Sequence, residues 1–458
     1  MRLTKFIAHI FRRYLPSPFT IAVLLTLLTF AIAFFFTSSS VEQNHLFAIF
    51  SYWENGIWNN DLLVFAYQMM LILVLGHVLV LSKPMKGVIS SIVKHVRNTS
   101  NAAVLVVVST MMVSFFNWGL GLIFGALLAR KVGEYAQGNG IPLNYPLIGA
   151  CGYAGLMVWH GGISGSAPIK VSEDGHLKSL MQFVSTDEWL TKLPVSISTS
   201  STVFSLSNIL IFTVVLITIS LLVFYLGKRT APTKMDLTKY AFKARSKEGL
   251  VGAEKLDFSR PLALTFGVLI LLVFLIQYLP ALRKLNITPN MLNFFMLGLA
   301  IILHGNFQSF LAAVDSAIKD VAGILIQFPL YFGVMGIMAN SGMIDRISNF
   351  FVTISTDATL PIFTFFSAGL VNVFVPSGGG QWAIQGPLVI QSALQLNVPL
   401  PKAVMALAYG DQITNMLQPF WALPLLAITK LRAKEILPYT LLFMLVGSII
   451  YIVGLLLF

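Results

Sequence analysis

Charged residues and cysteine are scarce in this chain, and each shortage excludes a class of protein. Only 10% of the 458 residues are charged and 56% are hydrophobic, whereas a soluble domain carries about 25% charged residues. This composition excludes a soluble globular protein. The single cysteine, Cys151, excludes an internal disulfide and any cysteine-based metal cluster.

Motifs for nucleotide hydrolysis, metalloprotease chemistry and thiol redox chemistry are also missing. The chain contains no Walker A, HExxH or CxxC pattern, and an ATP-driven pump would need a phosphate-cradling loop on this chain or on a partner. No segment lines up a nucleophile, a base and oxyanion donors. We therefore expect no enzyme and no cofactor beyond a coupling ion, H⁺ or Na⁺. The energy would come from an ion gradient or from the substrate's own gradient.

Long apolar runs recur from one end of the chain to the other. A helix needs about 20 apolar residues to cross roughly 30 Å of hydrocarbon. Runs near this length are Phe19–Phe36, Leu62–Leu81, Ser205–Gly227, Pro261–Leu279, Val321–Ala339 and Leu437–Phe458. No small-residue cleavage site follows the first run, so we expect it to be retained as a span. The predicted fold class is an all-α membrane protein embedded in a lipid bilayer.

Lysine and arginine are distributed unevenly between the segments that join these runs. Four basic residues precede the first run, and residues 37–61 contain neither Lys nor Arg. The positive-inside rule therefore places the N-terminus in the cytoplasm. Following the chain from there puts 23 of the 30 basic residues on the cytoplasmic side. The net charge of +12 is thus a membrane-orientation signal, and we expect no nucleic-acid partner.

Residues 228–260 are the one long polar stretch, with nine basic and four acidic residues. We interpret this stretch as a cytoplasmic linker between an N-terminal half, residues 1–227, and a C-terminal half, residues 261–458. It has no apolar period and is too small to be a catalytic or sensory output domain.

The two halves share an internal repeat, in which Gly76–Pro168 corresponds to Gly336–Pro424. Each unit contains a short amphipathic stretch, two apolar arms joined at a polar tip, a proline-bearing turn and a long segment interrupted by polar residues and glycine. Each arm has about 15 residues, which is short for a full crossing, so we interpret the arms as re-entrant hairpins. The first, near residues 102–133, would enter from the cytoplasm and the second, near 358–397, from outside.

This arrangement predicts an inverted repeat in which each half has a re-entrant hairpin and a broken transmembrane helix. Transporters of this kind bind substrate near the midplane, where the repeats meet. The alternative is two ordinary pairs of tightly packed helices with glycines at their contacts. Packing alone does not explain the matched polar tips.

The tip of the second hairpin is the sharpest local signal. Its residues are Ser377, Gly378, Gly379, Gly380, Gln381 and Trp382. Consecutive glycines expose backbone N–H groups, and at the N-terminus of a helix these groups favour an anion such as a carboxylate. The alternative is a tight turn needed only for the hairpin bend.

The tip of the first hairpin contains Asn117, Trp118 and Gly119. An asparagine amide can donate to a carboxylate or offer its oxygen to a cation, although it can also cap its own hairpin. Trp118 and Trp382 at the tips, with Trp159 and Trp421 in the broken helices, could form walls around a small apolar tail, or they could be packing residues.

Ionisable residues in the two broken helices are candidates for ion coupling. Asp411 is the only carboxylate placed deep in a predicted span, where such residues are costly unless paired or functional. It could carry a proton or, together with Asn415, act as a metal ligand for Na⁺. Thr414 and Asn415 could contact substrate or cation. His160 could titrate, bind substrate or pair with a carboxylate, and both His160 and Asp411 could instead be structural.

Several of these segments resemble one known family. Val375–Trp382, Ala408–Gln412 and Pro419–Pro424 look like the bacterial short-chain fatty acid transporter family of the AtoE type, and Asn117–Gly119 and Trp159–Gly162 extend the likeness. The resemblance covers essentially the whole chain. It implies membership of the ion transporter superfamily, whose members typically form dimers and move substrate by an elevator-like motion.

The resemblance also implies uptake of short-chain fatty acids such as butyrate or acetoacetate. The leading hypothesis is secondary active symport of a small carboxylate with H⁺ or Na⁺, by a homodimer. A dicarboxylate or amino-acid carrier of the same superfamily and an anion channel remain as alternatives.

Overall fold

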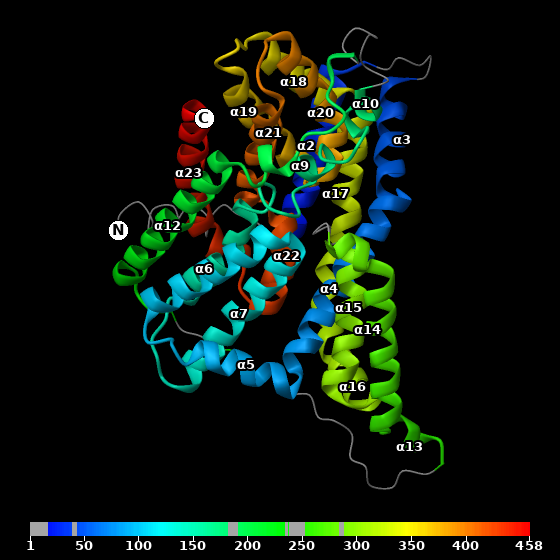
Figure 1. The fold of residues 1–458 in the computed structure, drawn as a ribbon, viewed down its shortest axis with the longest axis vertical. Helices are drawn as coiled ribbons and strands as arrows, with labels where there is room; N and C mark the ends of the chain where they lie inside the picture. The colour runs from blue at the N-terminus through cyan, green and yellow to red at the C-terminus, as the bar shows by residue number, and fades with distance from the viewer. Residues whose placement is uncertain (1–16, 39–43, 182–190, 234–236, 238–251, 284–287) are drawn as a thin grey trace.

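The computed structural model describes residues 17–38, 44–181, 191–233, 237, 252–283 and 288–458. Within these residues the chain consists of helices joined by turns and loops, with no strand (Figure 1). Six of the described helices are long and apolar enough to cross a membrane. Their apolar segments are Phe19–Phe36, Leu62–Leu79, Thr99–Phe116, Leu206–Arg229, Arg260–Arg283 and Ala433–Leu457. The predicted all-α membrane fold is confirmed.

The long helices begin and end close to the bounds of the apolar runs. They are α2 (Pro18–Phe36), α4 (Asn60–Leu81), α12 (Leu206–Arg229), α14 (Arg260–Arg283), α17 (Ala322–Asn340) and α23 (Ala433–Leu457). Ser17, Asn59 and Ser205 cap three of them by accepting a backbone N–H of the first turn. Hydropathy therefore fixes the length of these helices, and capping residues fix their starts.

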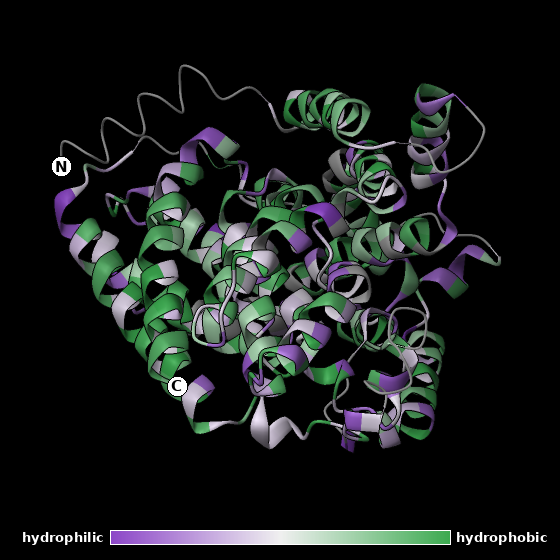
Figure 2. Ribbon diagram, turned by 90° about the horizontal axis from the view of Figure 1, so that it is seen from above, coloured by the Kyte–Doolittle hydropathy of each residue, from purple (hydrophilic) through white to green (hydrophobic). Residues whose placement is uncertain are grey.

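The outer helices present apolar side chains to their surroundings. Leu221 of α12 and Ile276 of α14 are 64% and 72% exposed, as expected for helices that face lipid hydrocarbon. Figure 2 shows that the long helices are mostly hydrophobic, with hydrophilic residues gathered mainly at helix ends and in connections.

The first hairpin consists of α6 (Thr99–Phe116) and α7 (Trp118–Gly138), joined at Asn117. Asn117 ends α6 and also caps α7. The amphipathic helix α5 (Lys83–Val93) precedes the pair. At 18 residues α6 is itself long enough to cross a membrane, so arm length alone does not argue for a re-entrant hairpin.

The second hairpin consists of α19 (Leu360–Phe374) and α20 (Gly378–Gln395), with Ser377 as the N-cap of α20. The helix α18 (Met343–Thr353) precedes it, as α5 precedes the first hairpin. In Figure 1, α5 lies towards the lower end of the molecule and α18 towards the upper end. These positions agree with inverted units, although the inversion itself stays a prediction.

Each hairpin is followed by an interrupted helix. In the first, α8 (Tyr145–Tyr153) continues through a short 3₁₀ turn, Ala154–Met157, and an irregular segment before α9 (Ser166–Lys170). In the second, α21 (Leu400–Thr414) leads through the 3₁₀ turn Asn415–Leu417 to α22 (Pro419–Thr429). Pro419 lacks an N–H and so suits the first position of a new helix. The expected interruptions are therefore present in the structure.

The remaining helices flank these units. α3 (His45–Ile57) packs against α17, and α15 (Pro289–His304) and α16 (Phe307–Ala317) pack with α4 and α14. Buried residues from both halves belong to one hydrophobic cluster, which includes Met157 and Phe420.

The predicted linker, residues 228–260, is described only in part. It contains the end of α12 and the short helix α13 (Glu254–Asp257), and residues 234–236 and 238–251 lie outside the described residues. The division of the chain into two halves therefore stays a prediction.

Candidate functional site

The two broken helices meet through hydrogen bonds at the interruption of the first. The backbone N–H groups of His160 and Gly161 donate to Gln412 Oε1 at 2.8 and 3.0 Å. These N–H groups lie in an irregular segment, where a helix would otherwise supply the acceptor. Gln412 of α21 therefore satisfies the opened backbone of the first broken helix.

The His160 side chain joins the same two elements. Its Nδ1 donates to Asp411 Oδ2, and its Nε2 accepts the backbone N–H of Ala167 at 3.0 Å. A ring nitrogen that accepts a hydrogen bond carries no proton, so the imidazole is neutral and its proton is on Nδ1. Both side chains are buried, at 0% and 1% exposure. The structure thus makes His160 the partner that orients Asp411.

Two buried oxygens beside this pair have no hydrogen-bond donor. They are Asp411 Oδ1 and Gln381 Oε1. Gln381 uses its Nε2 to donate to Ala368 O and to Gln385 Oε1, both at 2.9 Å. Buried polar atoms are rarely left without partners, so this pair of free acceptors marks a place where something positive could bind.

The glycine-rich tip of the second hairpin touches the His160 ring. A methyl group at Gly378 would lie 2.9 Å from His160 Cε1 and 2.6 Å from Trp159 Cη2, so this position requires glycine. Ser377 Oγ accepts the N–H of Gly380 at 3.2 Å. In the described part of the chain the N–H groups of Gly378 and Gly379 have no acceptor, so the start of α20 presents two free donors.

A cavity of about 390 Å³ is lined by Gly379, the second of these glycines. Its lining residues are Ile163, Ser164, Gly165, Ser166, Ile169, Lys170, Glu173, His176, Leu180, Thr288, Gly379 and Trp382. Gly379 and Ser166 face each other, because a methyl group at Gly379 would lie 3.8 Å from Ser166 Oγ. The volume falls in the range of small-molecule sites. The cavity lies between the first broken helix and the second hairpin.

The first hairpin tip contacts the same region through the backbone of Trp118 and caps its own second arm through Asn117. Asn117 Oδ1 accepts the N–H of Leu120 at 2.9 Å, and the Trp118 N–H donates to Ser164 Oγ at 2.9 Å. The Trp118 ring packs against Trp159, with ring centroids 5.9 Å apart. Asn117 therefore acts as a cap, and Gly119 follows it in the first turn of α7.

Thr414 and Asn415 are held by a residue that sequence analysis missed. Asn372 of α19 donates through Nδ2 to Thr414 Oγ1, Asn415 Oδ1 and the Asp411 carbonyl at 2.9, 2.8 and 2.7 Å. The Tyr153 hydroxyl donates to the Asn415 carbonyl at 2.8 Å. These contacts fix the shape of the second break. Gln412 was also missed, although it directly follows Asp411 in the chain.

Trp382 points towards a different neighbour from Trp159. Its Nε1 donates to His176 Nε2 at 3.0 Å, and it packs in a cluster with Leu177 and Met181. His176 begins α10 (His176–Met181), a six-residue helix outside the candidate spans. Burial lowers the pKa of His176 below 6.5, and nearby Glu173 opposes this effect. The neutral ring can therefore accept the indole proton.

The described residues contain no group of three or more His, Cys, Asp or Glu side chains that could hold a metal ion. Of the two residues predicted as Na⁺ ligands, Asn415 offers an oxygen that already accepts from Asn372. The other predicted ligand, Asp411, has one oxygen, Oδ1, that accepts no hydrogen bond. Asn415 Oδ1 keeps a second lone pair for a cation, so both Na⁺ ligands stay a prediction.

Six apolar helices long enough to cross a membrane, in the described part of the chain, define a multi-pass membrane protein. The family model described as "Short chain fatty acid transporter" matches residues 1–458. The chain therefore belongs to the short-chain fatty acid transporter family, and the expected family and the non-enzymatic class are confirmed.

Two curated relatives carry the name short-chain fatty acid transporter. The one from Escherichia coli (strain K12) is 36% identical, and the match covers 100% of this chain and 99% of the relative. The one from Haemophilus influenzae is 35% identical over 99% of each chain. Family membership thus extends over the full length.

Two solved structures are similar at low identity. The YdaH transporter of Alcanivorax borkumensis matches with a TM-score of 0.46 and 15% identity, over 96% of this chain and 98% of that one. MtrF of Neisseria gonorrhoeae, described with a class of antimetabolite efflux pumps, matches with a TM-score of 0.42 and 13% identity over 97% of each chain. Both scores are below 0.5, so the fold rests on the chain's own elements.

Proposed function

We propose that this protein takes up short-chain monocarboxylates, such as butyrate or acetoacetate, by symport with H⁺ or Na⁺ across a bacterial inner membrane. Family membership supports the substrate class. The observation that carries the proposal is the cavity beside the start of α20. There the free N–H groups of Gly378 and Gly379 offer a carboxylate two backbone donors at the positive end of a helix dipole.

The remaining lining of the cavity suits one carboxylate and a short tail. Lys170 and Glu173 pair with each other at 3.0 Å, which leaves little positive charge for a second carboxylate. Ile163, Ile169 and Leu180 offer apolar contact for the tail. This balance favours a monocarboxylate over a dicarboxylate.

Ion coupling is assigned to the buried pair. A buried carboxylate without a compensating positive charge is costly, so H⁺ or Na⁺ bound at Asp411 would stabilise the site. In this proposal His160 holds Asp411 in place through Nδ1 and does not carry the ion itself. The pair contacts the substrate-binding tip through Gly378, so ion and substrate are bound by neighbouring atoms.

Orientation, assembly and motion complete the proposal. The N-terminus lies in the cytoplasm, the first hairpin enters from that side and the second from outside. The protein is a homodimer that moves its substrate by an elevator-type motion. The opposite positions of α5 and α18 (Figure 1) support the inverted arrangement.

Uptake of labelled butyrate into proteoliposomes tests the function directly. The protein should accumulate butyrate when an inward H⁺ or Na⁺ gradient is imposed, with saturable kinetics and with inhibition by acetoacetate. Asp411→Asn keeps the size of the side chain but removes its charge, and it should abolish gradient-driven accumulation.

The same assay separates the alternatives. Inhibition by succinate or glutamate as strong as that by acetoacetate would identify a carrier of another substrate class. Butyrate flux without saturation would identify a channel. Absence of uptake under both gradients would overturn the proposal.

A further inference from the structure

Two buried acceptor oxygens from different elements of the site lack any donor. Asp411 Oδ1 belongs to the second broken helix and Gln381 Oε1 to the second hairpin, and the two residues are 1% and 0% exposed. Each is the free oxygen of a side chain whose other polar atom is hydrogen-bonded. Two acceptors cannot satisfy each other.

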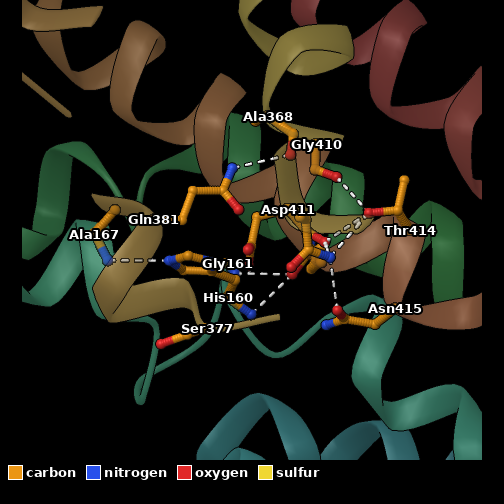
Figure 3. Close-up of polar contacts among 12 residues, drawn as sticks. His160, Gly161, Ala167, Ala368, Ser377, Gln381, Gly410, Asp411, Thr414 and Asn415 are labelled. Atoms are coloured by element: carbon orange, nitrogen blue, oxygen red, sulfur yellow. Dashed lines mark hydrogen bonds and ion pairs between the residues drawn. The ribbon is translucent and has the colours of Figure 1, made fainter. Parts of the chain in front are cut away.

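Contacts on both sides bring Gln381 to Asp411. Gly378 touches the His160 Nδ1 edge that bonds Asp411, and Gln381 lies one turn further along the same face of α20. Gln381 also donates to Ala368 O. The next residue, Gly369, packs against Gly410 of the Asp411 helix, where an added methyl would lie 3.3 Å from the Gly410 carbonyl oxygen. Figure 3 shows the Gln381 amide on the side of α20 that faces Asp411.

The orientation of the Gln381 amide is determined by its neighbours. Its Nε2 donates to two oxygens, Ala368 O and Gln385 Oε1. Gln385 in turn donates through its own Nε2 to Ser367 Oγ at 2.7 Å. A flipped Gln381 amide would place its oxygen against two acceptors, so the amide nitrogen stays with these acceptors and Oε1 is left without a donor.

We infer that Gln381 Oε1 and Asp411 Oδ1 together bind the coupling cation, with Gln381 as the ligand supplied by the second hairpin. That this cation is the coupling ion rests on the proposed function, whereas the two free oxygens are observed in the structure. Their shared chemistry is a proton held between two oxygens or a Na⁺ bound to both. In either form the bound cation links the hairpin tip to the broken helix, and its release leaves two acceptors that repel each other.

The side chains that hydrogen-bond Asp411 in the described part of the chain carry no positive charge. The first broken helix contributes His160, which is neutral and donates to Oδ2. α19 contributes Asn372 and α20 contributes Gln381, neither of which titrates. None of these three side chains therefore competes with a positive charge at Oδ1.

Thermal stability of the full-length protein in lipid nanodiscs tests this inference without substrate. One series varies Na⁺ at fixed pH, and the other varies pH without Na⁺. The wild-type midpoint should rise with Na⁺ in the first series or with proton concentration in the second, which identifies the ion. Gln381→Met keeps the side-chain volume but removes the oxygen, and it should raise the ion concentration needed for half the shift by about tenfold.

Gln381→Glu keeps the acceptor and adds charge, so it should lower that concentration. Ser392→Ala is the matched control on α20, because Ser392 is buried but bonds only its own helix at Leu388 O, and it should behave as wild type. Wild-type ion dependence in Gln381→Met, or equal impairment in the Met and Glu variants, would overturn the inference. So would a wild-type midpoint that neither ion shifts. Ion dependence with no butyrate uptake would overturn the proposed function alone.

Discussion

At the scale of single residues, His160 has its two ring nitrogens engaged by different partners. Nδ1 donates to Asp411, and Nε2 accepts from the Ala167 backbone at 3.0 Å. Adding a proton to Nε2 would break the second bond and bury a charge. The imidazole is therefore best suited to hold Asp411 in position.

His160→Asn separates positioning from proton carriage. The asparagine amide nitrogen can donate to Asp411 where Nδ1 does, so uptake should stay within about threefold of wild type with an unchanged pH profile. His160→Ala leaves Asp411 Oδ2 without a donor and should reduce uptake at least about tenfold, which corresponds to about 1.4 kcal/mol. A folded Asn variant whose uptake no longer depends on pH would show that His160 carries the proton.

His176 gives a second expectation at this scale, because its ring accepts the Trp382 indole proton at 3.0 Å. Burial places the folded pKa of His176 below the ordinary 6.5. The unfolded chain therefore takes up this proton at a higher pH than the folded protein does. The contribution to stability is complete above pH 6.5 and is lost as pH falls through the folded pKa.

His176→Gln should remove this pH dependence, because the glutamine oxygen accepts the Trp382 proton at every pH. The measurement is the difference in thermal midpoint between wild type and variant from pH 8 to pH 5. The thermal midpoint of the variant should rise relative to that of the wild type as the pH falls. A constant difference would show that His176 does not contribute.

At the scale of elements, the two glycines that open α20 differ in their surroundings. A methyl at Gly378 meets Trp159 Cη2 at 2.6 Å, whereas a methyl at Gly379 meets only Ser166 Oγ at 3.8 Å. Gly378→Ala should therefore displace the tip and reduce butyrate uptake more than about tenfold. Gly379→Ala keeps the same backbone N–H and should cause a smaller loss. Equal effects in the reconstituted variants would contradict the close contact of the tip with the His160 ring.

The elements were predicted from the sequence with unequal success. Long helices followed from hydropathy, and the breaks followed from glycine, proline and polar residues, because both signals are local. The length of α6, 18 residues, was not predicted. The sequence analysis expected arms of about 15 residues on either side of the polar tip. Asn117 was predicted as a ligand or a cap; it caps α7 through Oδ1, and its role as a ligand stays a prediction.

Contacts between elements could not be predicted from the sequence. Asn372 lies in an apolar arm, and only the packing of α19 against α21 brings it to Thr414 and Asn415. Gln412 similarly acquires its partners from the other half of the chain, through the His160 and Gly161 amides. A single sequence does not show which polar side chains meet across 250 residues or more.

At the scale of the whole molecule, the site depends on both halves at once. Tyr153 of the first half bonds the Asn415 carbonyl, and Tyr451 of the second half bonds the Met157 carbonyl. One hydrophobic cluster runs through both halves. The cavity likewise has the first broken helix on one side and the second hairpin on the other. A relative movement of these elements would therefore open or close the cavity.

The central claim is that the start of α20 binds the carboxylate of the substrate. The most direct measurement is a crystal structure of the full-length protein with a bromine-labelled butyrate, whose bromine is located by anomalous scattering. The account predicts a carboxylate within hydrogen-bond distance of the Gly378 and Gly379 N–H groups, with the bromine near Ile163 and Ile169. A carboxylate bound at Asn117, or at Thr414 and Asn415, would contradict it.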